Sequence, residues 1–433
     1  MKKLISIILS LLAVCACSQD REHTIKVYNW SNYIDEDVIP LFEEWYEEQT
    51  GEPIKVIYQT FDINETMLSK IEKGQEDYDV VCPSDYIIER MLNSGLLVPL
   101  DFKSLPDSIN YIRNNRSPYI QEMFRKINPD IDANDYSVAF MWGTVGILYN
   151  AAYVTDEEAS TWGIFNNPKF EGRIFIKDAP RDVFTPILMY LKRDELRSGV
   201  LTLDELIQDS SDESVAAVEA FMKQVSPLVA GWEADFGKEQ MTQERGYVSL
   251  NWSGDAVWAI EEAADVNVDL RYIVPEEGSN VWFDGWVIPK YAKNVKAATY
   301  FIDFMCRPDI AIRNMDVTGY VSANGDISVL ESQIDETLEP IDVSYFFPGQ
   351  DSVCVSPALY PDIHTIEHCA LMHDWGADSY KLLEMWARVK GDNANAMTLI
   401  VIALVVVAFA VFGFVKSRNS RRKHSSSSKK GRR

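Results

Sequence analysis

The chain contains 433 residues, and its 66 Asp and Glu against 41 Lys and Arg give a formal net charge of −25. A chain this acidic is a poor partner for nucleic acids and anionic substrates and favours small cations. Its length exceeds one ordinary hydrophobic core, so two lobes are expected.

The N-terminus has the pattern of a bacterial secretory signal. Lys2 and Lys3 precede an uncharged apolar run, so residues 1–17 are interpreted as a signal peptide. The run ends in Val-Cys-Ala-Cys, which resembles a lipobox with Cys17 as the lipidated residue, because the small Ala16 precedes it. A plain cleaved signal with incidental cysteines is the alternative.

Strands and helices then alternate. Expected strands lie at 24–29, 54–58 and 78–82, and expected helices at 35–51, 66–72 and 85–95. This alternation predicts a mostly parallel sheet with covering helices.

A polar stretch rich in Asn and Pro, 101–135, precedes a second α/β set. Its expected strands lie at 136–142 and 146–149 on either side of Gly143, and at 173–177, 246–250, 270–274 and 281–289. Its expected helices lie at 183–196, 214–224, 256–264, 296–305, 309–315 and 378–389.

The C-terminal segment 397–415 is almost entirely aliphatic or aromatic and carries no charge. It is long enough to cross a hydrocarbon core of roughly 30 Å, which predicts a transmembrane helix. Nine Lys and Arg in 416–433 predict a cytoplasmic tail and place the rest of the chain outside the inner membrane. Without the basic residues of the two ends, 30 Lys and Arg remain against 66 acidic residues, a net charge near −36.

Cysteine and histidine suggest neither a disulfide framework nor a metal centre. Cys354 and Cys369 could pair in an oxidising space, although no framework spacing supports it. His364 and His368 are one helical turn apart, but nothing like a complete metal motif surrounds them. We therefore expect no metal and no cofactor.

Aromatic side chains recur with carboxylates or hydroxyls where expected strands end. The junctions are 28–33, 83–86, 251–255 and 281–286, with carboxylates alone at 178–182 and a phenol at Tyr320. Singly, each such Trp or Tyr could be a core residue and each Ser or Asp a helix cap. Together they favour one crevice, because the carboxyl ends of parallel strands meet at one edge.

In sequence order, these segments resemble the polyamine-binding proteins of bacterial ABC importers. The resemblance rests on Tyr-Asn-Trp-Ser-Asn-Tyr from Tyr28, Tyr-Asp-Val-Val-Cys-Pro-Ser-Asp-Tyr from Tyr78, Trp-Ser-Gly-Asp from Trp252 and Trp-Phe-Asp from Trp282. It implies an α/β, two-lobe type II periplasmic binding-protein fold with a hinge, to which the sequence adds the C-terminal transmembrane helix. The expected limits are 24–141 and 286–325 for lobe one, and 142–285 and 326–391 for lobe two.

The resemblance also implies a set of ligand-binding residues. They are Trp30, Ser31, Tyr33, Ser84, Tyr86, Asp182, Trp252, Asp255, Trp282, Asp284 and Tyr320, with Asp178 aligned only if one residue is inserted. Asp255 resembles the branch of the family that prefers putrescine. Met372 stands where the spermidine branch has a glutamine.

A diamine carries two ammonium groups on a methylene chain, and burying each charge requires carboxylates or hydroxyls in place of water. We expect Asp284 and Asp255 to receive one ammonium, and Asp182 with Ser84 or Ser31 to receive the other. The aromatic residues would wall the methylenes. A ligand that bridges both lobes favours the closed state, which an ABC permease can recognise.

The expected function is therefore capture of a polyamine, with putrescine preferred, at the periplasmic face of the inner membrane, without catalysis. The anchors would be the C-terminal span and a lipid on Cys17. A binding protein of the same fold for another small cation is the main alternative. An envelope glycosidase is a weaker one, since paired carboxylates in an aromatic cleft also suit sugar hydrolysis.

Overall fold

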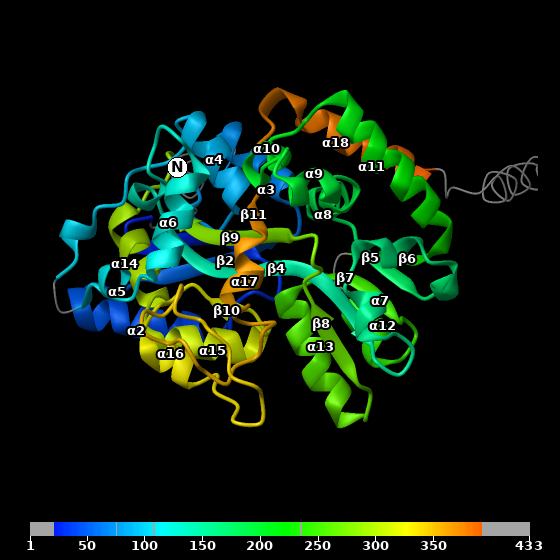
Figure 1. Cartoon of the computed structure of the whole chain (residues 1–433). Coiled ribbons are helices and arrows are strands. Elements are labelled where there is room, and N and C mark those ends of the chain that lie inside the picture. Colours follow the sequence, from blue (N-terminus) through cyan, green and yellow to red (C-terminus); the bar gives the residue numbers. More distant parts are fainter. Residues whose placement is uncertain (1–20, 75, 107–108, 234–235, 392–433) are drawn as a thin grey trace, which may run out of the picture.

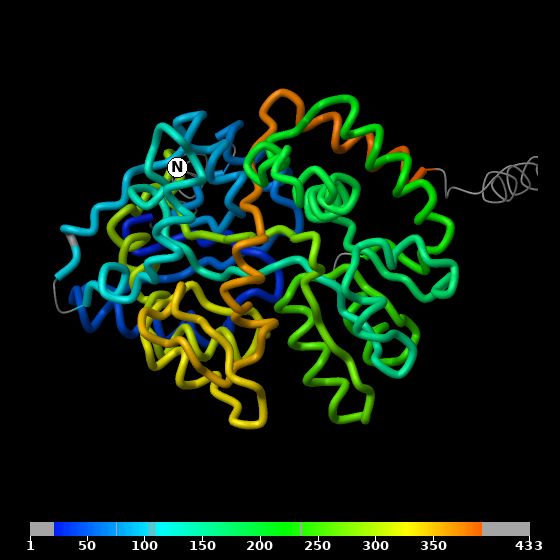
Figure 2. Tube along the Cα trace, viewed as in Figure 1, coloured from blue at the N-terminus to red at the C-terminus, as the bar shows by residue number. Residues whose placement is uncertain are grey.

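The computed structural model describes residues 21–74, 76–106, 109–233 and 236–391. Figures 1 and 2 show two α/β bodies side by side, joined across the middle by strands common to both. The strands are β1 (Thr24–Trp30), β2 (Lys55–Phe61), β3 (Val80–Val81), β4 (Ser137–Asn150), β5 (Ile174–Lys177), β6 (Val229–Glu233), β7 (Val248–Trp252), β8 (Leu270–Ile273), β9 (Ser279–Val287), β10 (Val321–Ser322) and β11 (Cys369–Leu371). The longer helices are α2 (Val38–Thr50), α3 (Asn64–Glu72), α4 (Asp85–Asn93), α6 (Pro118–Ile127), α8 (Pro180–Leu191), α11 (Asp212–Val225), α13 (Ser253–Asp265), α14 (Val295–Met305), α15 (Pro308–Thr318) and α18 (Ser379–Gly391). The shorter ones are α5 (Tyr111–Asn114), α7 (Asp156–Ala159), α9 (Arg193–Ser198), α10 (Leu203–Ile207), α12 (Gly237–Thr242), α16 (Ile327–Glu331) and α17 (Ile363–Glu367).

The sheet of lobe one is built on β1, which pairs in parallel with β2 and β3. Most of β1 is buried, and Ile25 and Val27 are completely so. Helix α2 returns the chain to β2 and ends at Gly51, whose φ of 73° suits a residue without a side chain. The carboxyl ends of β1 and β3 therefore lie at one edge of this sheet, as the alternation predicts.

Strand β4 is continuous for 14 residues, where two strands separated at Gly143 were expected. Its first half pairs with β9 and β10, and its second half pairs with β7 and β8, so it passes from one lobe into the other (Figure 1). A side chain at Gly143 would lie 2.4 Å from Ser253 Oγ and 2.6 Å from Trp282 Cζ2. The glycine thus makes room for neighbouring side chains and does not end the strand.

The lobe limits remain a proposal. The contacts of residues 327–360 favour placing this segment with lobe one, although it was expected in lobe two. Helix α16 packs against α15, and the Phe346 ring stacks on Trp142 with centroids 5.2 Å apart. Ser117, just before α6, donates a hydrogen bond to the carbonyl of Phe346. Residues 327–360 therefore lie beside lobe one, and the chain returns to lobe two near β11.

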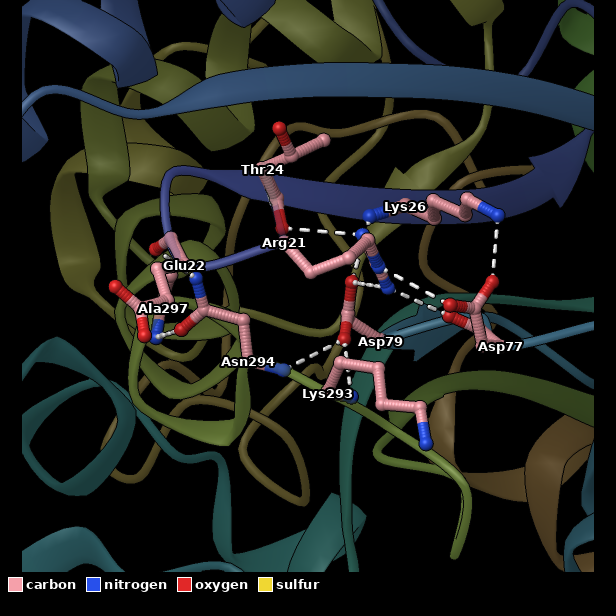
Figure 3. A network of polar contacts seen from close by, with 9 residues as sticks. All are labelled: Arg21, Glu22, Thr24, Lys26, Asp77, Asp79, Lys293, Asn294 and Ala297. Atoms are coloured by element: carbon pink, nitrogen blue, oxygen red, sulfur yellow. Dashed lines mark hydrogen bonds and ion pairs between the residues drawn. The ribbon is translucent and has the colours of Figure 1, made fainter. Parts of the chain in front are cut away.

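The buried carboxylate of Asp79 joins several segments at the end of the lobe-one sheet where β1 begins (Figure 3). Asp79 accepts hydrogen bonds from the backbone N–H groups of Lys26, Lys293 and Asn294 at 2.7–2.8 Å, and from Arg21 Nη2 at 2.8 Å. These bonds join the start of β1, the residue before β3 and the start of α14. They hold the end of the sheet that is opposite the strand ends carrying the aromatic clusters.

The cysteine and histidine pairs considered in the sequence analysis lie outside those clusters. Cys354 and Cys369 are both free thiols, and Cys369 Sγ donates to the Thr365 carbonyl. The His368 ring contacts the carbonyl of His364 at 2.7 Å. Across the described ranges, no three His, Cys, Asp or Glu side chains are grouped so that they could hold a metal ion.

The expected fold class needs one correction. The two-lobe α/β architecture is present, but none of the helices in the described part of the chain has the length and apolar character to cross a membrane. The transmembrane helix expected at 397–415, like the signal peptide and Cys17, lies outside the described residues. The described fold is therefore the two-lobe α/β architecture without the expected transmembrane helix.

Candidate ligand-binding site

Asp284 is the centre of the candidate site. It lies on β9, is only 6% exposed, and accepts hydrogen bonds from Tyr33 OH and Ser84 Oγ, both at 2.6 Å. Tyr33 follows β1 and Ser84 follows β3, and Ser84 forms an isolated antiparallel bridge with Asp284. Three elements that are distant in sequence thus meet at one carboxylate.

Burial controls the charge of Asp284. It raises the pKa of this carboxyl to about 6, although the hydrogen bonds from Ser84 and Tyr33 oppose the shift. Among the described residues, no Lys or Arg forms an ion pair with it. A carboxylate held in this way is suited to an external cation.

Asn64 and Tyr86 support Ser84. The Asn64 amide donates to Ser84 Oγ at 3.0 Å and to Tyr86 OH at 3.1 Å. The guanidinium of Arg181, on α8 of lobe two, lies 4.3 Å from the centre of the Tyr86 ring. This contact joins the two lobes beside the site.

A chain of aromatic rings extends from Tyr33, which bonds to Asp284. The Tyr320 ring is 5.1 Å from that of Tyr33 and 5.7 Å from that of Trp282, both in edge-on geometry. Gly254, in the first turn of α13, allows this approach, because a side chain there would lie 2.3 Å from Tyr320 Cδ1. The glycine of Trp-Ser-Gly-Asp therefore has a packing role at the site.

A second carboxylate, Asp182, comes from the first turn of α8. Trp252 Nε1 donates to its Oδ2 at 3.1 Å, while its buried Oδ1 has no partner of good hydrogen-bond geometry among the described residues. Burial raises the pKa of Asp182 to about 6. The negative charge of Asp182 also raises the pKa of Asp284, so the two carboxylates act on each other.

Asp255 is close to the aromatic cluster but already has cationic partners. Lys177 Nζ lies 2.6 Å from its Oδ2, and Lys238 Nζ lies 3.2 Å from its Oδ1. Neither lysine was expected from the sequence. The signal that could have indicated Lys177 is its place as the last residue of an otherwise apolar strand, Ile-Phe-Ile-Lys.

Three expected residues have other neighbours. Trp30 packs on Phe61, with ring centroids 4.6 Å apart, and Ser31 is exposed and donates to Asp62. Asp178 accepts a hydrogen bond from Trp386 Nε1 at 2.7 Å and forms an ion pair with Lys390, both on α18. Asp178 thus fastens the C-terminal helix to lobe two.

Two lobes that share β4, with unpaired carboxylates and rings gathered where the lobes touch, are the architecture of extracytoplasmic solute-binding proteins. The chain belongs to the bacterial extracellular solute-binding protein family, whose pattern matches residues 44–335. The proteins of this family are solute-binding proteins.

Named relatives are similar over most of the chain. It is 28% identical over 383 residues to a spermidine/putrescine-binding periplasmic protein of Escherichia coli, covering 88% of this chain and 96% of the relative. It is 28% identical over 316 residues to a putrescine-binding periplasmic protein of Escherichia coli, covering 70% of this chain and 78% of that protein. A solved Listeria monocytogenes structure assigned to spermidine/putrescine ABC transport is 31% identical, with a TM-score of 0.68, covering 85% of this chain and 99% of that one.

Proposed function

We propose that this protein captures a polyamine of the putrescine and spermidine class outside the cytoplasm and delivers it to an ABC permease. The observation that carries the proposal is Asp284, a buried carboxylate with two hydroxyl donors and no cationic partner among the described residues. The names of the relatives support the same ligand class.

In this proposal, Asp284 receives one ammonium of the ligand, with Ser84 and Tyr33 fixing the orientation of the carboxylate. Asp182 receives the other, because its Oδ1 is buried and has no hydrogen bond of good geometry among the described residues, although the Asn280 side chain lies close enough to lower its pKa. A buried ammonium is stable only when a counter-charge and hydrogen-bond acceptors replace its water.

The rings of Trp282, Tyr320 and Trp252 supply the apolar part of the site. They suit the methylene chain between two ammonium groups, and each cation–π contact adds about 0.5–2 kcal/mol. Trp282 is 7% exposed and Tyr320 9% exposed, so a methylene chain held against these rings would be removed from water. The proposed wall also includes Trp30, which is half-buried and packs on Phe61.

Delivery requires that the ligand stabilise the closed arrangement of the lobes. The contacts that already join them include Arg181 over Tyr86, and Glu89 of α4 with the backbone N–H of Asp374 at 2.8 Å. A ligand held by Asp284 and Asp182 would add a bridge to this set. The closed state is then the form that a permease recognises.

The same proposal places the protein at the outer face of the inner membrane through a lipid on Cys17. The support is the sequence Val-Cys-Ala-Cys after a basic and apolar leader. Replacing Cys17 by Ser should release the protein from the membrane fraction, and an unchanged distribution would contradict lipid anchoring at this residue.

Titration calorimetry tests the ligand class and the role of Asp284. We expect saturable one-to-one binding of putrescine or spermidine, and at least a roughly 30-fold weaker affinity for Asp284→Asn, because a charged hydrogen-bonding partner is worth about 2 kcal/mol or more. Asp62→Asn is the matched control, since Asp62 is an exposed carboxylate that accepts from Ser31. Absence of heat with every polyamine would refute the proposed ligand class.

A further inference from the structure

Lys177 is a buried cation inside the aromatic and acidic cluster. Its side chain is 0% exposed, and its Nζ lies 2.6 Å from Asp255 Oδ2 and 3.1 Å from Glu233 Oε1. The same ammonium lies 4.3 Å from the centre of the Trp252 ring. Carboxylates on one side and an indole face on the other are the surroundings that a ligand ammonium would need.

Both oxygens of Asp255 are occupied by protein cations. Oδ2 contacts Lys177, and Oδ1 contacts Lys238 at 3.2 Å. Burial alone would raise the pKa of Asp255, but the two lysines outweigh burial and lower it. Asp255 is therefore ionised and compensated within the protein.

Asp284 and Asp182 differ from Asp255 in this respect. Burial raises the pKa of both carboxyls, although the charges of Arg181 and Lys177 oppose the shift at Asp182. Among the described residues, neither carboxylate has a Lys or Arg nitrogen at ion-pair distance. The cluster thus contains two carboxylates available to an external cation and a third that is already neutralised. Asp85, which is also buried nearby, uses its oxygens to accept the backbone N–H groups of Tyr86 and Phe283.

A ligand ammonium cannot easily replace Lys177. The lysine is fully buried at the end of β5, so a ligand that took its place on Asp255 would leave the lysine charge out of water and with one carboxylate partner fewer. Its charge also repels a further ammonium that approaches the face of Trp252.

We propose that Lys177 is a specificity-determining residue: its fixed ammonium fills a third cation position, so that the site selects a diamine over a triamine. The inference rests on the proposed polyamine function. The two ligand ammonium groups go to Asp284 and Asp182, and Asp255 acts as the partner of Lys177 and not as a ligand contact.

Calorimetric titration of the full-length protein with putrescine and with spermidine tests this inference. We expect wild type to prefer putrescine. Lys177→Met removes the ammonium from Asp255 Oδ2 and Glu233, while Lys238 stays on Asp255 Oδ1, and should shift the affinity ratio towards spermidine by at least tenfold. Lys296→Met is the matched control, because Lys296 is an exposed lysine of lobe one that pairs with exposed Glu52. It should leave the affinity ratio within about twofold of the wild-type value.

A second measurement needs no variant. In a crystal structure of the wild-type protein with putrescine, we expect Lys177 Nζ still bonded to Asp255, and no ligand nitrogen within hydrogen-bond distance of Asp255. A ligand nitrogen bonded to Asp255 would overturn the inference, as would an unchanged affinity ratio in a folded Lys177→Met protein. Both results leave the polyamine function intact, whereas a wild type that binds neither polyamine removes that function and the inference with it.

Discussion

At the scale of the residue, three aspartates of the site differ in the groups that surround their carboxylates. Asp284 is held by two hydroxyls, Asp182 by one indole, and Asp255 by two lysines. The first two have a pKa raised by burial, and the third has a pKa lowered by its cations. The surroundings of each carboxylate decide its chemistry, which residue identity alone does not.

The raised pKa values predict how ligand affinity depends on pH. Asp284 and Asp182 hold protons below about pH 6 in the ligand-free protein, while the ligand amines stay charged across this range. Cation binding must then expel those protons, so putrescine should bind at least tenfold more weakly at pH 5 than at pH 8. Calorimetry near pH 6 in buffers of different ionisation heat should show net proton release, and proton uptake would contradict this assignment.

The role expected of Asp255 shows where sequence reasoning reaches its limit at this scale. Its motif, Trp-Ser-Gly-Asp, places it correctly at the start of a helix after a strand. Its partners Lys177 and Lys238 are 78 and 17 residues away, and their approach depends on the pairing of β5 with β7 and on the position of α12. By contrast, the resemblance assigned both Ser84 and Asp284 to the site, and the structure joins them, because Ser84 follows β3 and bridges Asp284 inside the antiparallel β9.

At the scale of the element, the first turn of α13 positions the Tyr320 ring. Gly254 leaves the space that this ring fills, and Tyr320 in turn contacts Tyr33 and Trp282. The sequence predicts the helix itself, but the need for glycine comes from a phenol 66 positions later in the chain. Gly143 in β4 is a similar case, since the expected break does not occur.

Gly254→Ala should therefore weaken ligand binding without changing the fold. The added methyl overlaps the Tyr320 ring, and such overpacking typically costs about 1–3 kcal/mol. We expect roughly tenfold weaker putrescine binding by calorimetry and an unchanged far-ultraviolet circular dichroism spectrum. Gly391→Ala is the control, because a side chain there meets no atom within 4 Å. Equal affinities for the two variants would show that the position of the Tyr320 ring does not matter.

At the scale of the whole molecule, polar side chains of α4 and α8 contact the opposite lobe. Glu89 of α4 accepts from the backbone N–H of Asp374 at 2.8 Å and contacts His373 Nδ1 at 3.1 Å, and Arg181 covers Tyr86. The α/β alternation of each lobe could be predicted from sequence. The position of residues 327–360 beside lobe one could not, because it depends on contacts distant in sequence, such as the hydrogen bond from Ser117 to the Phe346 carbonyl.

Glu89→Ala should shift the ligand-free protein towards an open arrangement. Removing the acceptor leaves the Asp374 N–H and His373 without their partner in lobe one. Apparent affinity falls in proportion to the population of the closed state, and we expect a three- to tenfold loss. Small-angle scattering should show a larger radius of gyration, and Glu72→Ala, which removes an exposed pair within lobe one, should not. A radius of gyration equal to that of wild type would show that the Glu89 contacts do not stabilise the closed arrangement of the lobes.

The continuity of β4 has a consequence for cooperativity. This strand is central to both sheets, with β9 and β10 along one half and β7 and β8 along the other. If either core melts, the other loses a paired neighbour, so the free energies of the two cores are coupled through one backbone segment. Heating should therefore give a single calorimetric transition whose van't Hoff and calorimetric enthalpies agree, with the slowest-exchanging amides along β4 in both lobes.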